Sequence, residues 1–310
     1  MKKIAFIPKI FLENNKLSDR VRHFFRAVER KLDFDVYFKD KIEAEACDAD
    51  VLLIYAGVHG KELAREALNI KKPKKIFILT GLHSFDKSLI ERIVDSSSLV
   101  LVTYKSYFDL KFKEFSEKVF FFPLYFAPYE RYSRLKPMKD PILKCLITGH
   151  SNPKVYPVRH ELKLKIKQNK KLWSLFAIAR HPRWFKDKGP FKEYELAPVI
   201  NESYAKLLNR YFCSLATDSK YRYGLAKYFE IPASGCLLLA IETDDIQAVG
   251  FRPWVHFVPV ERNNIVERVI EVVKNPERYK GIKQQGREFV LKNHSVLNRI
   301  NELKSYMERL

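Results

Sequence analysis

The sequence predicts an α/β protein in which two parallel-sheet domains face a cleft. Short apolar runs, typical of strands buried on both faces, alternate with longer amphipathic stretches along most of the chain. A segment rich in proline and charge, YSRLKPMKDP at residues 132–141, interrupts this alternation, which then starts again. The length of 310 residues suits two domains of about 150 residues each.

The first half of the chain supplies the strands of the first predicted sheet. Apolar runs predict strands at 3–7, 34–38, 50–55, 75–80, 99–104 and 118–124. A helix is predicted at 18–31, where Phe24, Phe25 and Val28 follow helical spacing. Ser18 is a suitable cap for the first turn of this helix.

The second half repeats the pattern. Strands are predicted at 144–149, 172–179, 211–216, 236–241 and 255–260. Helices are predicted at 158–169, 204–210, 225–234, 264–275 and 277–293. Gly235 is expected to end the helix at 225–234, and Pro232 makes that helix either short or kinked. Two such halves are typical of Rossmann-like domains.

The last segment of the chain has an apolar stripe. Leu297, Ile300, Leu303, Met307 and Leu310 follow helical spacing. A free helix rarely carries such a stripe, so we expect a partner surface, either elsewhere in the chain or on a second copy.

The chain is strongly basic, with a formal net charge of +20. Residues 151–200 contain 12 basic and 4 acidic residues. Such a field attracts anions, which include phosphorylated ligands, nucleic acid and acidic membrane surfaces. The excess charge is equally compatible with an ordinary solvated surface, so charge alone does not choose a ligand.

Cysteine usage and hydropathy indicate a cytoplasmic protein. Cys47, Cys145, Cys213 and Cys236 are far apart and have no metal-binding spacing, so reduced thiols are expected. No window of 18 consecutive apolar residues predicts a membrane span. The N-terminal residues read as a strand and not as a signal peptide.

Ligands of parallel α/β sheets bind beyond the carboxyl ends of the strands, so the residues that follow each apolar run are candidates. In the first half they are Tyr55 to His59, Gly81 to His83, Tyr104 and Lys105. A histidine such as His83 suits a general base, and a structural role for it is also open. In the second half they are Gly149, Arg159, Lys163, Arg180 and His181. Lys163 also fits a solvated basic helix.

Glu230 lies inside the helix predicted at 225–234, in the stretch KYFEIPASGCLLLA. A carboxylate near the first turns of such a helix can face the ligand. It can equally be a surface carboxylate, or a partner of Lys227 or Arg222. The residue pattern leaves both readings open.

The segment RYGLAKYFEIPASGCLLLA resembles the C-terminal domain of GT-B glycosyltransferases of the group-1 type, in the branch that includes spore-maturation glycosyltransferase-like proteins. The resemblance extends to YAKLLNRYFCSLATDS, to the helices at 264–293 and to residues 103–132. It implies an acceptor-binding domain at 1–135 and a nucleotide-sugar-binding domain at 142–293. It also implies that 294–310 is a helix that packs on the first domain.

The resemblance also implies roles for single residues. Glu230 would accept hydrogen bonds from the two ribose hydroxyls of the donor, since a carboxylate suits a vicinal diol. Arg222 stands where many of these enzymes have a second glutamate that contacts the donor sugar, so it would serve the departing diphosphate. The donor nucleotide site would comprise Glu230, Arg159, Gly149, Lys227 and Arg180.

The predicted function is transfer of a sugar from a nucleotide-diphosphate sugar to a glycan, lipid-linked or other hydroxyl acceptor. The resemblance implies that no cofactor and no metal ion is needed, because side chains and helix dipoles stabilise the diphosphate. His83 would be the base if the reaction inverts. The glycine-rich loop found after the first strand in many of these enzymes is missing, and FIPKIFLENN stands there instead.

Three alternatives stay open at this point. The first is an inverting fucosyltransferase-like GT-B enzyme. The second is a basic nucleic-acid-binding protein, against which the aromatic residues lie mostly in apolar runs and no recognised nucleic-acid motif is present. The third is a nucleotide-binding protein without turnover. Association with a membrane surface is compatible with the basic stretch, whereas the oligomeric state is not indicated.

Overall fold

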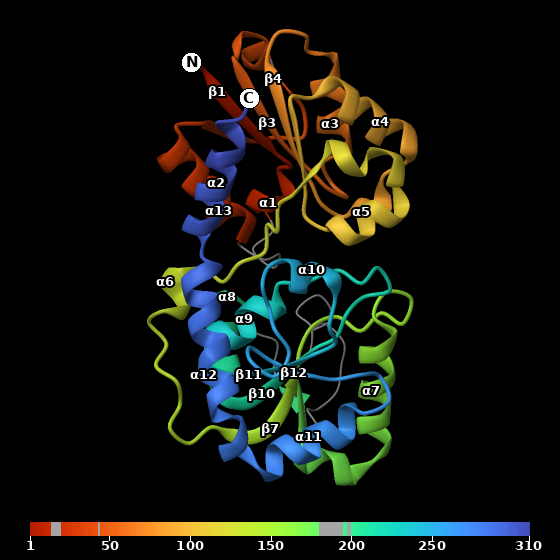
Figure 1. Ribbon diagram of the computed structural model, residues 1–310, viewed down its shortest axis with the longest axis vertical. Coiled ribbons are helices and arrows are strands. Elements are labelled where there is room, and N and C mark those ends of the chain that lie inside the picture. The colour runs from red at the N-terminus through yellow and green to blue at the C-terminus, as the bar shows by residue number, and fades with distance from the viewer. Residues whose placement is uncertain (14–19, 43, 180–194, 197–199) are drawn as a thin grey trace. The chain divides into compact units, whose positions relative to one another are not determined.

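Two parallel sheets of six strands each form the framework of the chain (Figure 1). The computed structural model describes residues 1–13, 20–42, 44–179, 195–196 and 200–310. The chain divides into two units: unit 1 contains Met1–Tyr125 and Val296–Leu310, and unit 2 contains Phe126–Ser295. The parallel sheets confirm the predicted α/β class.

Unit 1 contains the first sheet, with its strands in the order β2-β1-β3-β4-β5-β6. The strands are β1 (Lys3–Ile7), β2 (Asp35–Phe38), β3 (Val51–Ala56), β4 (Lys74–Leu79), β5 (Leu99–Val102) and β6 (Phe120–Phe121). The connecting helices are α1 (Ile10–Glu13), α2 (Arg20–Leu32), α3 (Lys61–Asn69), α4 (Lys87–Ser96) and α5 (Lys105–Lys111). The 3-10 turns are η1 (Ala44–Asp48), η2 (Leu82–Ser84) and η3 (Lys113–Lys118). Strands β3 and β5 are buried along their whole length, as expected for a sheet covered on both faces.

Unit 2 contains the second sheet, with its strands in the order β12-β11-β10-β7-β8-β9. The strands are β7 (Ile142–Ile147), β8 (Phe176–Ala179), β9 (Glu195–Leu196), β10 (Tyr211–Ala216), β11 (Leu237–Ala240) and β12 (Val258–Pro259). The helices are α6 (Tyr129–Tyr132), α7 (Pro157–Gln168), α8 (Asn201–Asn209), α9 (Lys227–Ala233), α10 (Asp244–Ala248), α11 (Ile265–Lys274) and α12 (Pro276–Asn293), with the 3-10 turn η4 at Lys170–Ser174. One apolar core joins the inner strands to α7, α11 and α12.

Helix α7 shows how the sequence directs a charged residue inward. Pro157 occupies its first turn, where the missing N–H costs nothing. Leu162 and Ile166 bury one face against the sheet, and Arg159 lies on the same face one turn earlier. The guanidinium of Arg159 is therefore carried beneath the loop that follows β7.

Helix α9 is short, which is one of the two outcomes expected from Pro232. It spans seven residues, and the last six of them, Tyr228 to Ala233, are buried. Gly235 follows with φ +79°, a left-handed conformation that favours glycine. A Cβ atom there would also lie 3.3 Å from Pro137.

Three predicted strands are reduced to half of their expected length or less, and one of them, 255–260, becomes β12 (Val258–Pro259). The prediction for 118–124 is reduced to Phe120–Phe121, because Pro123 has no N–H to donate to a ladder. The prediction for 172–179 is reduced to Phe176–Ala179, since its first part is the turn η4. The indole of Trp173 donates to the carbonyl of Ile166 at 2.9 Å, which holds this turn against α7.

The C-terminal helix α13 (Val296–Met307) belongs to unit 1, where it packs against α2. Its buried apolar residues are Val296, Ile300 and Leu303. The Tyr306 hydroxyl donates to the carbonyl of Phe121 at 3.0 Å. Leu297 is 53% exposed, so the predicted apolar stripe is wrong at that residue: Val296 takes its place on the buried face.

None of the described helices is long and apolar enough to cross a membrane. The cysteines form no disulfide: Cys47 is exposed, and Cys145, Cys213 and Cys236 are buried. Burial raises the pKa of the Cys145 and Cys236 thiols, so these side chains behave as small apolar groups of the core.

Candidate active site

The strand order of unit 2 reverses between β7 and β10. From β7 the chain continues through β8 to β9 on one side, and from β10 it continues through β11 to β12 on the other. The loops that leave such a pair of strands separate, and open α/β sheets bind ligands in the crevice that results. The candidate site is therefore built from the residues that directly follow β7 and β10.

Three cations, which we call the cation cluster, converge on the loop after β7. Lys163 Nζ of α7 donates to the carbonyl of Gly149 at 3.0 Å, and Lys227 Nζ of α9 donates to the carbonyl of Thr148. Arg159 donates through Nη1 to the carbonyl of His150 at 2.8 Å, and through Nη2 to the carbonyl of Thr217 at 3.3 Å. Each ammonium keeps further N–H donors for a ligand.

The cation cluster is buried, and a carboxylate acts on each of its members: Asp218 on Arg159, Glu195 on Lys163 and Glu230 on Lys227. Burial lowers the pKa of Lys227 well below its usual range, and Arg159 and Lys163 lower it further, with only Glu230 acting in the opposite sense. Burial also lowers the pKa of Lys163 to about 8, again helped by Arg159. The lowered pKa values reflect the free energy that it costs to bury positive charges close together, and a bound polyanion would reduce that free-energy cost.

Gly149 adopts φ +87°, which favours glycine. A Cβ atom at this position would lie 2.5 Å from Lys227 Nζ and 3.3 Å from Arg159 Nη1. The absence of a side chain therefore lets two cations approach the backbone at the end of β7.

Glu230 lies in the first turn of α9 and is 7% exposed. The reading of Glu230 as a surface carboxylate is therefore wrong. Its charge acts on Lys227, three residues earlier on the same helix, and raises the pKa of that lysine. The structure thus brings Glu230 and the cation cluster into one neighbourhood.

Arg222 lies in the loop after β10 and is exposed, with φ +55°. Its guanidinium donates to the carbonyl of Glu242 at 3.4 Å. Arg222 and Arg159 both act on Asp218 in the same loop, where burial raises the pKa and the two arginines oppose that rise. Arg180 and His181 lie outside the described residues.

Aromatic rings lie beside these charges. Tyr221 and Tyr223 stack in the loop after β10 with their ring centroids 5.3 Å apart. Lys220 lies over the Tyr221 ring at 4.9 Å, and the Arg159 guanidinium lies over Tyr156 at 4.5 Å. Flat aromatic surfaces next to cations suit a ligand that has both a ring and phosphates.

Three buried oxygen atoms at the strand ends have no hydrogen-bond partner in the described part of the chain: Thr217 Oγ1, Glu242 Oε1 and Thr243 Oγ1. Thr217 directly follows β10, while Glu242 and Thr243 follow β11 closely. Buried polar groups normally have partners, so these atoms are available to the hydroxyl groups of a ligand. Sequence reasoning missed all three, although their position after the strands was a usable signal.

The strand ends of unit 1 have a different character. His83 lies in η2 after Gly81, and its side chain is exposed. Burial strongly raises the pKa of Tyr55 at the end of β3, so it stays neutral. Tyr104 and Tyr125 are joined through their hydroxyl groups, and the Arg20 guanidinium lies over the Tyr125 ring at 5.5 Å. Hydroxyl and aromatic groups dominate here.

The structure describes no group of three or more histidine, cysteine or acidic side chains that could hold a metal ion, within the residues that it covers. The cations at the end of β7 are suited to neutralise phosphate charge.

Comparisons with known proteins identify the fold. Residues 158–305, just under half of the chain, match the family described as "Glycosyl transferase-like". No curated protein sequence matches the chain. Anabaena HepE in complex with UDP-glucose superposes with a TM-score of 0.68 at 10% identity, and the match covers 100% of both chains.

Two further structures agree with this result. Sucrose-phosphate synthase from Thermosynechococcus elongatus has a TM-score of 0.64 at 9% identity, with 100% of this chain and 99% of that chain covered. S. aureus TarM has a TM-score of 0.57 at 12% identity, with 82% of this chain covered. The chain spans about half the length of TarM, with 54% of that chain covered. These matches confirm the predicted GT-B fold.

Proposed function

We propose that the chain is a GT-B-type glycosyltransferase that transfers a sugar from a uridine-diphosphate sugar to a hydroxyl acceptor, a proposal supported by its fold and by the family match of residues 158–305. The observation that carries this proposal is the cation cluster of Arg159, Lys163 and Lys227 at the reversal point of the second sheet.

The cation cluster would stabilise the leaving diphosphate. Negative charge grows on the diphosphate as the bond to the sugar breaks, and preorganised cations in a partly buried site stabilise that charge most effectively. Lys163 and Lys227 are held by backbone carbonyls, so they need little rearrangement. In this proposal the cations supply the charge that other transferases obtain from a metal ion.

Glu230 would hold the ribose of the donor. Its carboxylate is nearly buried beside the cation cluster, and its two oxygen atoms suit the two ribose hydroxyls. The stacked pair Tyr221 and Tyr223 offers an aromatic surface in the same unit. Arg222 is exposed, and its guanidinium donates to the carbonyl of Glu242. For Arg222 to contact the diphosphate, its side chain would have to turn inward.

The identity of the nucleotide is supported by similar structures. HepE contains UDP, UDP with glucose, and UDP-glucose in separate structures. The pneumococcal O-GlcNAc transferase GtfA contains UDP and GlcNAc, with a TM-score of 0.52 at 11% identity. We infer that this chain also takes a uridine-diphosphate sugar, and that Arg180 contributes to the same site.

The acceptor would be a glycan or a lipid-linked hydroxyl bound by unit 1. His83 is exposed at the carboxyl end of the first sheet, where it could take the proton of the acceptor hydroxyl. Exposed lysines on α7 and η4, namely Lys165, Lys167, Lys170 and Lys171, would favour an anionic membrane surface. Co-sedimentation with anionic vesicles but not with neutral vesicles is expected at low salt. Equal sedimentation with both would contradict this part of the proposal.

Calorimetry with UDP tests the donor site directly. The full chain should bind UDP, and Lys227→Met should weaken binding by about tenfold or more, since a hydrogen bond to a charged group is worth about 1.5–3 kcal/mol. Lys165→Met is the matched control, because Lys165 is exposed on the same α7 that carries Lys163. Absence of UDP binding, or an equal loss in both variants, would overturn the proposal.

A further inference from the structure

A second pocket lies at the opposite edge of the second sheet from the cation cluster. It is lined by Leu143 near the start of β7, Phe212 near the start of β10 and Gly235 just before β11. Strands of a parallel sheet all start at one edge, so this pocket is separate from the site at their carboxyl ends. Its volume of about 640 Å³ is within the range of small-molecule sites.

The walls of this pocket are held together by α12. Arg287 donates to the carbonyls of Tyr132 and Leu135 at 3.2 and 2.7 Å, and also to the carbonyl of Ala233 at the end of α9. Pro137 is in close contact with Gly235. These contacts join three parts of unit 2 into one frame: residues 132–137, the end of α9, and α12. The pocket is therefore already formed without a ligand.

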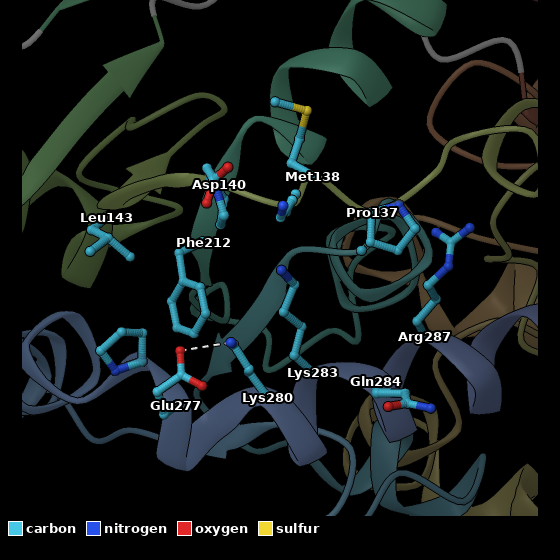
Figure 2. Close-up of a pocket in the computed structure, with 14 residues that line it drawn as sticks. Pro137, Met138, Asp140, Leu143, Phe212, Glu277, Lys280, Lys283, Gln284 and Arg287 are labelled. Carbon is cyan, nitrogen blue, oxygen red and sulfur yellow. Dashed lines mark ion pairs between the residues drawn. The ribbon is translucent and has the colours of Figure 1, made fainter.

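Lys283 is the unusual group in this frame. Figure 2 shows it reaching from α12 into the pocket between Phe212 and Pro137. Its Nζ atom lies 5.2 Å from the centre of the Phe212 ring. Within the part of the chain that the structure describes, it forms no hydrogen bond and no ion pair. The neighbouring Lys280, in contrast, pairs with Glu277 at 2.6 Å.

The electrostatics of Lys283 agree with an unfilled anion position. Burial lowers its pKa, the charges of Lys280 and Arg287 lower it further, and Cys236 and Cys213 act in the opposite sense. A half-buried ammonium among other cations is costly unless an anion joins it. The aromatic ring of Phe212 offers only a weak substitute for such an anion.

The other walls of the pocket carry apolar side chains together with charged ones, which include the carboxylates of Asp140 and Glu277. Met138 is 44% exposed and Leu143 is 45% exposed, and both line the pocket together with Phe212 (Figure 2). Large apolar side chains exposed next to an unpaired cation suit a ligand that has an anionic end and an apolar body.

We propose that this pocket binds a small organic phosphate, with the phosphate group on Lys283 and the apolar part against Met138, Leu143 and Phe212. A lysine is a compact point charge that suits phosphate, and the charges of Lys280 and Arg287 close by favour a dianion over a carboxylate. This inference is independent of the proposed transferase activity, because the two sites share no residue.

The methionines provide a direct measurement. The chain has 3 methionines, and Met138 is the one that lines the pocket, while Met1 and Met307 lie in unit 1. Methyl-labelled protein should give a Met138 signal that Met138→Leu assigns. Octyl phosphate, added below its micelle concentration in the presence of saturating UDP, should shift the Met138 signal saturably and leave the other two unchanged.

Two variants test the assignment to Lys283. Lys283→Met keeps the apolar stem and should weaken octyl phosphate binding by about tenfold or more. Lys292→Met removes an exposed lysine from the same helix outside the pocket and should change nothing. An unmoved Met138 signal in the natural chain, or equal affinities in natural chain and Lys283→Met, would overturn the proposal.

Further ligands separate the two parts of the chemistry and the source of the phosphate. Octanol and inorganic phosphate should each bind more weakly than octyl phosphate. If octanol binds equally well, the phosphate group is not recognised. If inorganic phosphate binds equally well, the apolar chain is not recognised. Vesicles of phosphatidylcholine with phosphatidic acid test a lipid source. Broadening of the Met138 signal by these vesicles, but not by phosphatidylcholine alone, assigns the phosphate to a lipid. A response to octyl phosphate alone assigns it to a soluble molecule, and both outcomes support the site.

Discussion

The two sheets have the same number of strands but differ in strand order and in the chemistry of their carboxyl ends. In unit 1 the order reverses between β1 and β3, whereas in unit 2 it reverses between β7 and β10. Unit 1 places tyrosines and an exposed histidine beyond its strands, and unit 2 places three cations there. Both sheets have a reversal point of the kind at which open α/β sheets bind ligands, and the two points differ in the side chains that surround them.

The difference also shows which basic residues matter. The excess of charge at 151–200 is spread over many lysines, and those of α7 such as Lys165 and Lys167 are exposed. Arg159 and Lys163 come from the same helix but turn inward and donate to backbone carbonyls. Position on the helix face, more than the local count of charges, therefore separates a solvated surface from a binding site.

The variant with the largest expected effect is His83→Gln, which tests whether unit 1 takes part in sugar transfer but not in nucleotide binding. His83→Gln should lower the rate of sugar transfer by about 10²–10⁴-fold, since it would remove a general base, and should leave UDP affinity unchanged. UDP release from the best donor measures the rate, and calorimetry measures affinity. Arg92→Gln is the control, because Arg92 is exposed on α4 of the same unit and does not follow a strand. Equal rates for the two variants would remove His83 from the mechanism.

Gly149→Ala tests whether the cation cluster of unit 2 binds the nucleotide. The added Cβ would meet Lys227 Nζ and Arg159 Nη1 while forcing alanine into φ +87°, so both cations should move. We expect UDP affinity to fall by about 100-fold, as two charge-assisted contacts are lost.

Gly281→Ala is the matched control for this variant. Gly281 lies within α12, and a Cβ there would have only the end of Gln285 within 4 Å, at 3.9 Å. This variant should keep UDP affinity and melt at the same or a slightly higher temperature. An unchanged UDP affinity in a folded Gly149→Ala chain would contradict the assignment of the cation cluster.

Glu230→Ala should weaken UDP binding by about tenfold to a hundredfold, because a charged acceptor for the ribose is lost. The sharper comparison uses 2′-deoxy-UDP. If Glu230 holds the ribose diol, the variant should lose more affinity for UDP than for the deoxy analogue. Glu267→Gln changes an exposed carboxylate of α11 and serves as the control. Equal losses for both nucleotides would place Glu230 elsewhere in the site.

Lys163→Met should have the smallest effect on UDP affinity, about tenfold at pH 7, together with an increase in stability. The folded pKa of Lys163, about 8, lies below its ordinary value of 10.5. The unfolded chain therefore binds more protons between these two pH values, so this group makes stability rise with pH from about 8 to 10.5.

Removal of the charge should accordingly raise the melting temperature of the free protein at pH 7. The natural chain should also lose UDP affinity as pH rises through about 8, and the variant should lose less over the same interval. Thermal melting and calorimetry from pH 7 to pH 9 check both statements, because this pH interval contains the pKa of Lys163, about 8. A lower melting temperature in the variant would mean that Lys163 stabilises the fold through contacts that outweigh its charge.

The α/β class and the paired parallel sheets could be predicted because apolar strand runs report burial on both faces. The lengths of β6 and β8 could not, since Pro123 and the Trp173 contact with α7 act through local hydrogen bonds that periodicity does not record. Likewise, Leu297 shares the spacing of its apolar neighbours, but it is exposed and Val296 is buried instead.

The candidate site was predictable in part. A strand end, a glycine and a following helix indicate a phosphate site around Gly149 and Arg159, and the structure places those residues together. Sequence spacing did not reveal that Lys163 turns inward while Lys165 faces solvent. Thr217, Glu242 and Thr243 follow strands, which was a usable signal, but that their buried oxygen atoms lack partners is a property of the folded surroundings that no motif records.

The C-terminal helix gives the chain an unusual response to mechanical load. Strand β1 and helix α13 both belong to unit 1, while the whole of unit 2 is a continuous loop of chain between them. A force applied between β1 and α13 is therefore carried by the contacts of unit 1, including the hydrogen bond from Tyr306 to Phe121, before any tension reaches unit 2. In a pulling experiment α13 should detach first, and only then should unit 2 begin to extend.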